Sequence, residues 1–379
     1  MIPRDAYLQI KASMFKGKVL HIPGARQVGK TTILKAIAGE DANNTLWLNG
    51  DDVDVRNALG NTSTARLGMY IGDKKLIIID EAQRIPNIGI TLKQIVDNFP
   101  DKQVIATGSS AFELANNINE PLTGRKIEIF LYPLSFAEMV SHHGLFEEER
   151  RLEHRLVYGY YPEVVTSAGM EVDILKRLSD AYLYKDIFTL ENIKKPVVLE
   201  KLLQALAFQV GSEVSINELS QTVGSDNKTV ERYIDLLEKA YIIFRLNCLS
   251  RNLRNELKKS RKIYFYDNGI RNAVIRNFNS TNLRQDIGVL WENFLVSERA
   301  KALQKQKLGC NKFFWRNHNQ QEIDYIEEYD GVLHAYEFKW NTTKKYNFPQ
   351  PFLQAYTENE TQIINRDNYL GFITQVAGI

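Results

Sequence analysis

Glycine, lysine and threonine residues near the start of the chain have the types and the spacing that bind phosphate. Residues 21–32 read HIPGARQVGKTT, and residues 24–31 fit the pattern G-x-x-x-x-G-K-T of a phosphate-binding loop. Glycines let the backbone turn so tightly that successive N–H groups point at phosphate oxygens. We expect a nucleotide to be bound by Gly24, Ala25, Arg26, Gln27, Val28, Gly29, Lys30, Thr31 and Thr32.

The segments around this loop decide whether the pattern is more than an ordinary glycine-containing turn. A strand-like run precedes it at residues 17–20, and helical spacing of apolar residues begins at Thr31. A helix that starts beside the loop directs the positive end of its dipole at the phosphates. Lys30 would then carry its ammonium to the β- and γ-phosphates, and the hydroxyl of Thr31 could ligate magnesium.

Two adjacent carboxylates follow the most apolar run in the first third of the chain. Residues 76–79 read LIII, which indicates a strand buried on both faces, as in a parallel sheet. Open α/β sheets bind their ligands at the carboxyl ends of such strands, where Asp80 and Glu81 follow. Asp80 is predicted to hold magnesium through water, and Glu81 to activate the attacking water as a general base. The alternative is a buried strand that ends in a solvated acidic turn.

Four segments occur in a characteristic order along roughly the first 140 residues, namely GARQVGKTT, LIIIDEAQR, VIATGSSAFEL and LTGRKIEIFLYPLSFAE. This order resembles the AAA+ superfamily, and more narrowly the prokaryotic AAA+ ATP-binding proteins that carry a restriction-endonuclease-like C-terminal domain. The resemblance implies a P-loop ATPase that uses ATP and Mg²⁺. Its core would comprise residues 1–145, and a helical lid residues 146–200.

Two further side chains could complete such a site. In ATPases of this kind the strand beside the acidic one carries a polar sensor of the γ-phosphate, and here either Thr107 or Ser109 could serve, with Ser109 preferred. Arg125 could stabilise the transition-state charge as an arginine finger, on its own nucleotide or on that of a neighbouring subunit. An ordinary surface arginine explains Arg125 equally well.

Length and composition restrict the class of protein. The chain has 379 residues, 44% hydrophobic and 25% charged, which is typical of a globular protein of two or three domains. A net charge of +2 gives no global basic field, so any nucleic-acid site must be local. Two cysteines are too few for a disulfide framework. Without a signal-like or membrane-spanning apolar run, we expect a cytoplasmic protein with no membrane partner.

The middle of the chain has the pattern of a winged helix-turn-helix. Helical segments at residues 201–210, 215–223 and 227–240 are followed by a strand at residues 241–246, with Gly224 in the turn before the third helix. We assign residues 201–262 to this module. The loop after the strand is basic and could neutralise DNA phosphates, although charge runs are usually solvated faces. Its cationic residues are Arg251, Arg254, Lys258, Lys259, Arg261 and Lys262.

The last third carries the pattern D…E-x-K on two strands of a predicted hairpin. Asp324 lies on the first strand, and Glu337 and Lys339 lie on one face of the second because strand side chains alternate. Glu292, on the preceding helix, could be an additional acid. The order resembles the PD-(D/E)xK nuclease fold, which implies metal-assisted phosphodiester hydrolysis by residues 263–379. A salt-bridged Glu-x-Lys pair is the alternative, and many proteins with this fold do not cut.

These features favour an α/β protein with an AAA+ parallel-sheet core, a helical lid, a winged helix and a nuclease-like domain. The hypothesis is an ATPase that drives or switches its C-terminal effector. One rival is an ATP-regulated, metal-dependent DNA nuclease, and another is a non-enzymatic, nucleotide-gated DNA or protein adaptor. AAA+ proteins commonly form rings, so a homo-oligomer is a further expectation.

Overall fold

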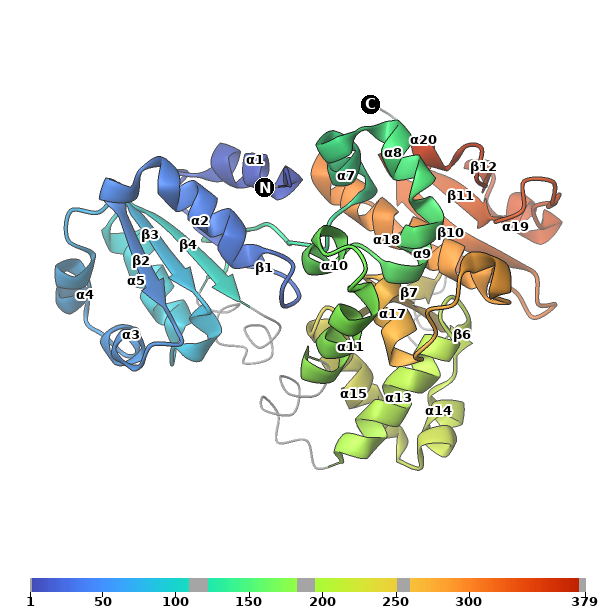
Figure 1. The fold of residues 1–379 in the computed structure, drawn as a ribbon, viewed down its shortest axis with the longest axis horizontal. Coiled ribbons are helices and arrows are strands. Elements are labelled where there is room, and N and C mark those ends of the chain that lie inside the picture. Colours follow the sequence, from blue (N-terminus) through green and yellow to red (C-terminus); the bar gives the residue numbers. More distant parts are fainter. Residues whose placement is uncertain (1, 109–121, 183–194, 251–259, 375–379) are drawn as a thin grey trace. The chain divides into compact units, whose positions relative to one another are not determined.

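A computed structural model describes residues 2–108, 122–182, 195–250 and 260–374 (Figure 1). Backbone contacts divide the chain into two compact units. The first extends to Leu134 and takes in residues 239–241, and the second begins at Ser135 and contains most of the remaining chain. The Ser135 boundary lies ten residues before the predicted end of the core at residue 145.

The first unit is a parallel sheet with helices packed on it. Its five strands lie in the order β2-β3-β4-β1-β5, and all four neighbouring pairs are parallel. The strands are β1 (Val19–Pro23), β2 (Thr45–Asn49), β3 (Leu76–Asp80), β4 (Gln103–Gly108) and β5 (Lys126–Glu128). The helices are α1 (Asp5–Ser13), α2 (Lys30–Glu40), α3 (Val53–Leu59), α4 (Thr64–Ile71) and α5 (Ile88–Asn98).

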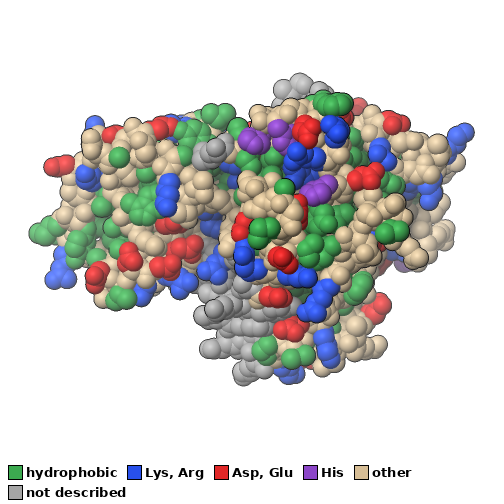
Figure 2. Space-filling view, in the orientation of Figure 1, with side chains coloured by type: hydrophobic (Ala, Val, Ile, Leu, Met, Phe, Trp, Pro, Cys, Tyr) green, Lys and Arg blue, Asp and Glu red, His purple; other side chains and the backbone are tan. Residues whose placement is uncertain are grey.

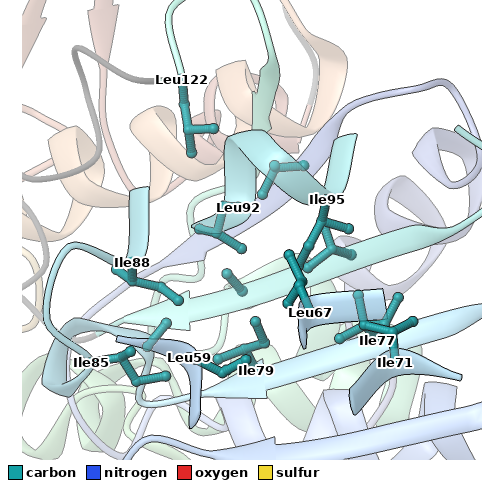
Figure 3. Packing of buried hydrophobic residues seen from close by; sticks show 14 residues of the cluster. Leu59, Leu67, Ile71, Ile77, Ile79, Ile85, Ile88, Leu92, Ile95 and Leu122 are labelled. Carbon is teal, nitrogen blue, oxygen red and sulfur yellow. The ribbon is translucent and has the colours of Figure 1, made fainter. Parts of the chain in front are cut away.

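Strand β3 is buried along its whole length, as its unbroken apolar run predicts. Ile77 and Ile79 point to the face covered by α3, α4 and α5, where they join one apolar cluster (Figure 3). Ile78 between them is also fully buried and points to the opposite face, because strand side chains alternate. Burial on both faces holds β3 as an interior strand of the sheet, between β2 and β4, and so fixes the position of Asp80 at its end.

The second unit contains a mixed seven-stranded sheet in the order β12-β11-β10-β9-β7-β8-β6. Its strands are β6 (Glu213–Val214), β7 (Ile243–Cys248), β8 (Arg261–Phe265), β9 (Asn311–Arg316), β10 (Glu322–Tyr329), β11 (Val332–Phe338) and β12 (Asn359–Ile364). Its helices are α7 (Phe136–His143), α8 (Leu145–Arg150), α9 (Leu152–Tyr158), α10 (Pro162–Thr166), α11 (Glu171–Tyr182), α13 (Pro196–Phe208), α14 (Ile216–Val223), α15 (Asn227–Lys239), α17 (Asn268–Val274), α18 (Ile287–Gln306), α19 (Gln350–Ala355) and α20 (Tyr369–Thr374).

The segment predicted as a winged helix folds as α13, β6, α14, α15, β7 and β8 in sequence. Both β6 and β7 pair antiparallel with β8. Strand β7 also pairs in parallel with β9, which joins this small sheet to the strands of the C-terminal segment. The predicted division between residues 262 and 263 therefore falls inside β8 of a continuous sheet, because the backbone hydrogen bonds of β7 are shared between the two segments.

The mixed α/β class with a parallel-sheet core and a second sheet towards the C-terminus is confirmed. The predicted hairpin is also present, since β10 and β11 pair antiparallel with Tyr325 opposite Tyr336. Continued by one residue, this register places Asp324 directly opposite Glu337, so the two side chains lie on the same face of the sheet.

Gly50 has a testable role at the edge where Asp80 lies. A Cβ on Gly50 would lie 2.2 Å from the carbonyl oxygen of Glu81. We expect Gly50→Ala to lower the free energy of unfolding of the first unit by about 1–3 kcal/mol, because backbone atoms must move apart. Thermal unfolding followed by calorimetry measures this.

Gly39→Ala in α2 is the matched control for this prediction. Nothing lies within 4 Å of a Cβ at that position, and alanine is the better helix former by roughly 0.5–1 kcal/mol. A Gly50→Ala protein as stable as the Gly39→Ala protein would contradict the close backbone approach.

Candidate functional site

The phosphate-binding loop connects β1 to α2 and has the backbone that its glycines permit. Gly29 has φ of 98°, in the left-handed region, and Gln27 also has a positive φ, 56°. A Cβ on Gly24 would lie 2.3 Å from the carbonyl oxygen of Leu131, so only glycine fits this close approach. The loop is thus shaped by local backbone conformation and by packing against the chain that follows β5.

Lys30 begins α2 and is only 5% exposed. Its ammonium donates to the carbonyl oxygens of Gly24 and Ala25, both at 2.8 Å. These bonds hold the cation across the mouth of the loop, where phosphate oxygens can replace the carbonyl acceptors. Of the other loop residues, Gln27, Thr31 and Thr32 are exposed, Arg26 is partly exposed, and Ala25 and Val28 are buried.

The carboxylate of Asp80 joins three elements at the carboxyl edge of the sheet. Thr31 of α2 donates its hydroxyl to Oδ2 at 2.8 Å, and Thr107 of β4 donates to Oδ1 at 2.5 Å. The two oxygens are therefore oriented by partners on opposite sides. Thr31 and Asp80 are in contact, and both offer oxygen atoms as metal ligands. This fits a hard cation such as Mg²⁺ held between them and a nucleotide.

Glu81 has the left-handed backbone conformation, with φ of 50° and ψ of 41°. Its N–H lies 3.2 Å from Oδ1 of Asp80 and 3.3 Å from Oγ1 of Thr107, and Gln83 donates its side-chain amide to the Glu81 carboxylate. A non-glycine residue in this region is strained by about 1–3 kcal/mol, and such residues gather at functional sites. The surrounding hydrogen bonds hold Glu81 beside Asp80.

The other two predicted residues of this site are placed differently. Ser109 lies outside the described residues. Arg125 immediately precedes β5, which pairs in register with the start of β1. The five residues of β1 separate that end from the phosphate-binding loop by about 15 Å. Arg125 instead pairs with Asp97 of α5 at 2.8 Å, so a finger role on its own nucleotide is wrong. A role on a neighbouring subunit stays a prediction.

Arg4 contacts the loop and was not among the predicted site residues. Its guanidinium donates to the carbonyl oxygen of Val28 at 2.6 Å and to that of Tyr132 at 2.7 Å. Both partners are backbone atoms far along the chain, so no residue pattern could have indicated the contact.

The four residues of the predicted nuclease site come together in the second unit. Asp324 lies on β10, Glu337 on β11 and Glu292 on α18, and Lys339 follows β11 and pairs with the Glu337 carboxylate. Oδ2 of Asp324 accepts the N–H of Phe338 at 2.9 Å. Oε2 of Glu337 is buried and has no hydrogen-bond partner among the described residues. We call Lys262, Glu292, Glu322, Asp324, Glu337 and Lys339 the carboxylate cluster.

Lys262 belongs to the carboxylate cluster, although the sequence predicted a different place for it. It was assigned to the basic DNA-contacting loop, but it lies on β8 and is fully buried. Its ammonium is 3.2 Å from Glu292, 2.6 Å from Glu322 and 3.5 Å from Asp324. The assignment to a DNA-contacting loop is wrong for Lys262, because a lysine that neutralises DNA phosphates must have an exposed side chain.

Burial and mutual repulsion perturb the acids of the cluster. Burial raises the pKa of Glu337 to about 8, and the charges of Asp324 and Glu292 act in the same direction. Burial also raises the pKa of Glu292 to about 7, Lys262 opposes this, and Asp324 adds to it. Burial disfavours the charge on Lys262, but nearby Glu292 and the other acids outweigh it, so the pKa of its ammonium is raised.

The rest of the predicted DNA-binding surface gives mixed results. Arg251, Arg254, Lys258 and Lys259 lie outside the described residues, while Arg261 pairs with Glu231 of α15 at 3.3 Å. Arg245 pairs with Asp235 and Glu238 of the same helix. On the face shown in Figure 2, lysine and arginine side chains are interspersed with aspartate and glutamate. Helix α15 carries three cations and three acids and so has no excess of positive charge; they are Lys228, Arg232, Lys239, Glu231, Asp235 and Glu238.

The carboxylate cluster contains oxygen atoms of the kind that bind a divalent cation, among them Oε2 of Glu337, which has no hydrogen-bond partner among the described residues. The ammonium of Lys262 lies between Glu292 and Asp324, so those two acids already share a cation. As arranged, the described residues include no group of three acidic, histidine or cysteine side chains in position to hold a metal ion. A metal would therefore bind through Glu337 and Asp324 only with some rearrangement of the cluster.

Three protein-family models match separate parts of the chain. Residues 16–140 match a family described as an AAA domain. Residues 149–281 and residues 287–371 match two different families, each described as a domain of unknown function. The first match covers the segment that contains Lys30 and Asp80 and supports the prediction of a P-loop ATPase domain there. A nuclease assignment of the last segment is not tested by its match.

Similar proteins are found in bacteria and archaea. An uncharacterised protein of Haemophilus influenzae is 29% identical over 301 residues, which are 73% of this chain and 74% of that protein. One from Mycobacterium tuberculosis is 26% identical over 347 residues, 90% of this chain and 74% of that protein. One from Methanocaldococcus jannaschii is 25% identical over 304 residues, 68% of this chain and 63% of that protein.

Solved structures give weaker likenesses. Cdc6p from Pyrobaculum aerophilum aligns with a TM-score of 0.29 and 12% identity over 78% of this chain and 96% of that one. The Pif1 helicase from Candida albicans aligns with a TM-score of 0.28 and 14% identity over 46% of this chain and 53% of that one. Among the described residues, no helix has the length and apolar character needed to cross a membrane.

The carboxylate cluster predicts how stability depends on pH. Glu292 and Glu337 bind protons more tightly in the folded state, where their pKa values are about 7 and about 8, than in the unfolded state, where both are near 4.5. As the pH rises through this range, the folded state loses these protons, and the free energy of unfolding falls. Replacing Glu337 with glutamine removes one such group. The stability of Glu337→Gln relative to the wild type should therefore rise between pH 5.5 and 8.5, by on the order of 2 kcal/mol.

Urea unfolding followed by tryptophan fluorescence measures this difference, since Trp291, Trp315 and Trp340 all lie in the second unit. Glu360→Gln is the control, because Glu360 lies on β12 of the same sheet with a 72% exposed side chain. A pH-independent difference between Glu337→Gln and the wild type would show that Glu337 is ionised at neutral pH.

Proposed function

We propose that the first unit binds magnesium–ATP and hydrolyses it. The observation that carries this is the Asp80 carboxylate, which accepts the hydroxyl of Thr31 from the phosphate-binding helix and lies next to Glu81. Magnesium–nucleotide sites use these two protein ligands, a threonine hydroxyl that follows a glycine-rich loop and an aspartate at the end of a strand. The AAA-domain match of residues 16–140 supports the same reading.

Each residue of the nucleotide site has a separate role in this proposal. Backbone N–H groups of residues 24–31 and the start of α2 bind the phosphates, and the Lys30 ammonium leaves the carbonyl oxygens of Gly24 and Ala25 to bind them too. Thr31 and Asp80 would hold the magnesium ion, which neutralises phosphate charge when bound. Glu81 accepts a proton from the water that attacks the γ-phosphorus. Thr107 orients Asp80 by its hydrogen bond.

Three elements of the proposal extend beyond this geometry. Ser109 is proposed as the γ-phosphate sensor on the segment after β4. Arg125 is proposed to act on the nucleotide of a neighbouring subunit, which requires a homo-oligomer. The second unit is proposed as the effector that nucleotide binding and hydrolysis drive or switch, with residues 146–200 as the lid and residues 201–262 as a winged helix.

Lys30→Ala and Glu81→Gln separate binding from hydrolysis. Lys30→Ala is expected to lose both ATP affinity and turnover, because it removes the cation that neutralises the phosphates. Glu81→Gln should keep ATP binding and lower turnover at least about a hundredfold, since it removes only the general base. Phosphate release and binding of a fluorescent ATP analogue measure the two properties. Unchanged turnover in Lys30→Ala would rule out the assignment.

A second candidate function is metal-dependent cleavage of DNA by the second unit. The observation in its favour is that Glu292, Asp324, Glu337 and Lys339, predicted from separate segments, meet in one buried cluster. Glu337 and Asp324 would hold a divalent cation, which supplies Lewis-acid activation of the phosphodiester when bound. Lys339 would stabilise charge on the phosphate, and Lys262 would hold Glu292 and Glu322 in place.

DNA cleavage in Mn²⁺, with and without ATP, tests the second candidate. The wild type should cut, and Asp324→Asn and Glu337→Gln should abolish cutting while leaving ATP turnover intact. Glu360→Gln on the same sheet should cut as the wild type does. Cutting that survives both substitutions within the cluster excludes it as the nuclease site. An absence of cutting together with nucleotide-dependent DNA binding supports the adaptor alternative instead.

A further inference from the structure

Arg4 bridges two backbone carbonyls, one in the phosphate-binding loop and one on the chain that follows β5. Nη1 donates to Val28, at the top of the loop, and Nη2 to Tyr132, on the chain that follows β5. Nη1 also lies 3.3 Å from the position of a Cβ on Gly29. The guanidinium thus binds Val28 and lies beside Gly29, and these are the two residues that immediately precede Lys30.

The bond to Val28 determines the direction of a neighbouring N–H group. The C=O of Val28 and the N–H of Gly29 belong to one peptide plane, and in a trans peptide they point in opposite directions. Because Arg4 holds this C=O, the Gly29 N–H points away from the guanidinium and is left available to a bound anion. A cation on the carbonyl also polarises the whole peptide, which strengthens the N–H as a donor to an anion.

The bond to Tyr132 gives the guanidinium a fixed base. The chain before Tyr132 is attached to the sheet, since the N–H of Leu131 donates to the carbonyl of Pro23 at 2.8 Å and that of Ile129 to His21 at 2.9 Å. Arg4 itself is the N-cap residue that immediately precedes α1, whose residue Ile10 is fully buried. Both ends of the bridge are therefore anchored, and the loop is the part that the bridge restrains.

We propose that Arg4 is a positioning residue of the nucleotide site, which fixes the Val28–Gly29 peptide in its phosphate-binding orientation. The proposal rests on the proposed binding of ATP by the first unit. Arginine suits this role because its planar fork binds two carbonyls at once, whereas the ammonium of lysine is a point charge that fixes neither direction. The N-terminal segment then belongs to the nucleotide site rather than only leading to the first strand.

Arg4→Ala tests the proposal in the full chain, with Lys11→Ala as the matched control. Lys11 lies on α1, the helix that follows Arg4, and pairs with the exposed Glu40, so its loss removes the same charge without touching the loop. Arg4→Ala should weaken ADP and ATP-analogue binding about tenfold or more, the loss expected for hydrogen bonds from a charged group. Lys11→Ala should bind as the wild type does.

Two further readouts separate positioning from a general loss of structure. Added guanidinium ion, below denaturing concentration, should restore nucleotide binding to Arg4→Ala and leave Lys11→Ala unchanged. In turnover assays Arg4→Lys should raise KM more than it lowers kcat, because Lys30 and Glu81 remain in place. A merely structural role would lower the melting temperature without a rescue of affinity by guanidinium.

The outcomes distinguish this inference from the proposed function. Wild-type nucleotide affinity in Arg4→Ala, or in Arg4→Lys where Arg4→Ala does not fold, overturns the positioning role. If Lys30→Ala loses binding in the same experiments, ATP binding still stands and only the role of Arg4 fails. If wild-type protein binds no nucleotide, the proposed function fails, and the role of Arg4 fails with it.

Discussion

The hydrogen bonds to the Asp80 carboxylate connect the parts of the first unit that would have to act together. Thr31 comes from the helix after the phosphate-binding loop, and Thr107 comes from the neighbouring strand β4. They meet only because β1, β3 and β4 are parallel and end at the same edge of the sheet. The apolar residues of β3 supply this arrangement, since burial on both faces prevents the strand from shifting.

The second unit has a contrasting organisation, in which charge is buried inside the fold. Lys262 of β8 reaches acids on α18 and β10, so the cluster links the strand of the predicted winged helix to the predicted nuclease segment. Removing one partner from such a buried set is costly, because it leaves an uncompensated charge. The cluster thus adds side-chain contacts between two segments whose strands are already joined by the backbone pairing of β7 with β8 and β9.

Short-range patterns predicted the parts of the fold and site that depend on local rules. The spacing of Gly24, Gly29 and Lys30 defined the loop, and strand alternation placed Asp324 near Glu337. The pattern did not identify Arg4, because its two partners lie 24 and 128 residues away and are backbone atoms without a sequence signature. Lys262 was misassigned because a run of cations was taken as one surface loop, although β8 begins at Arg261 and buries the next side chain. Arg125 was associated with the nucleotide because the order of motifs along the chain does not tell at which end of a parallel strand a residue lies.

The central claim is that Asp80 and Thr31 form a magnesium–nucleotide site in the first unit. Calorimetric titration with a non-hydrolysable ATP analogue, in the presence and absence of Mg²⁺, tests it most directly when wild type and Asp80→Asn are compared. The account predicts that Mg²⁺ strengthens binding to the wild type and has little effect on binding to Asp80→Asn. An equal effect of Mg²⁺ on both proteins, or wild-type binding that does not respond to Mg²⁺, would contradict it.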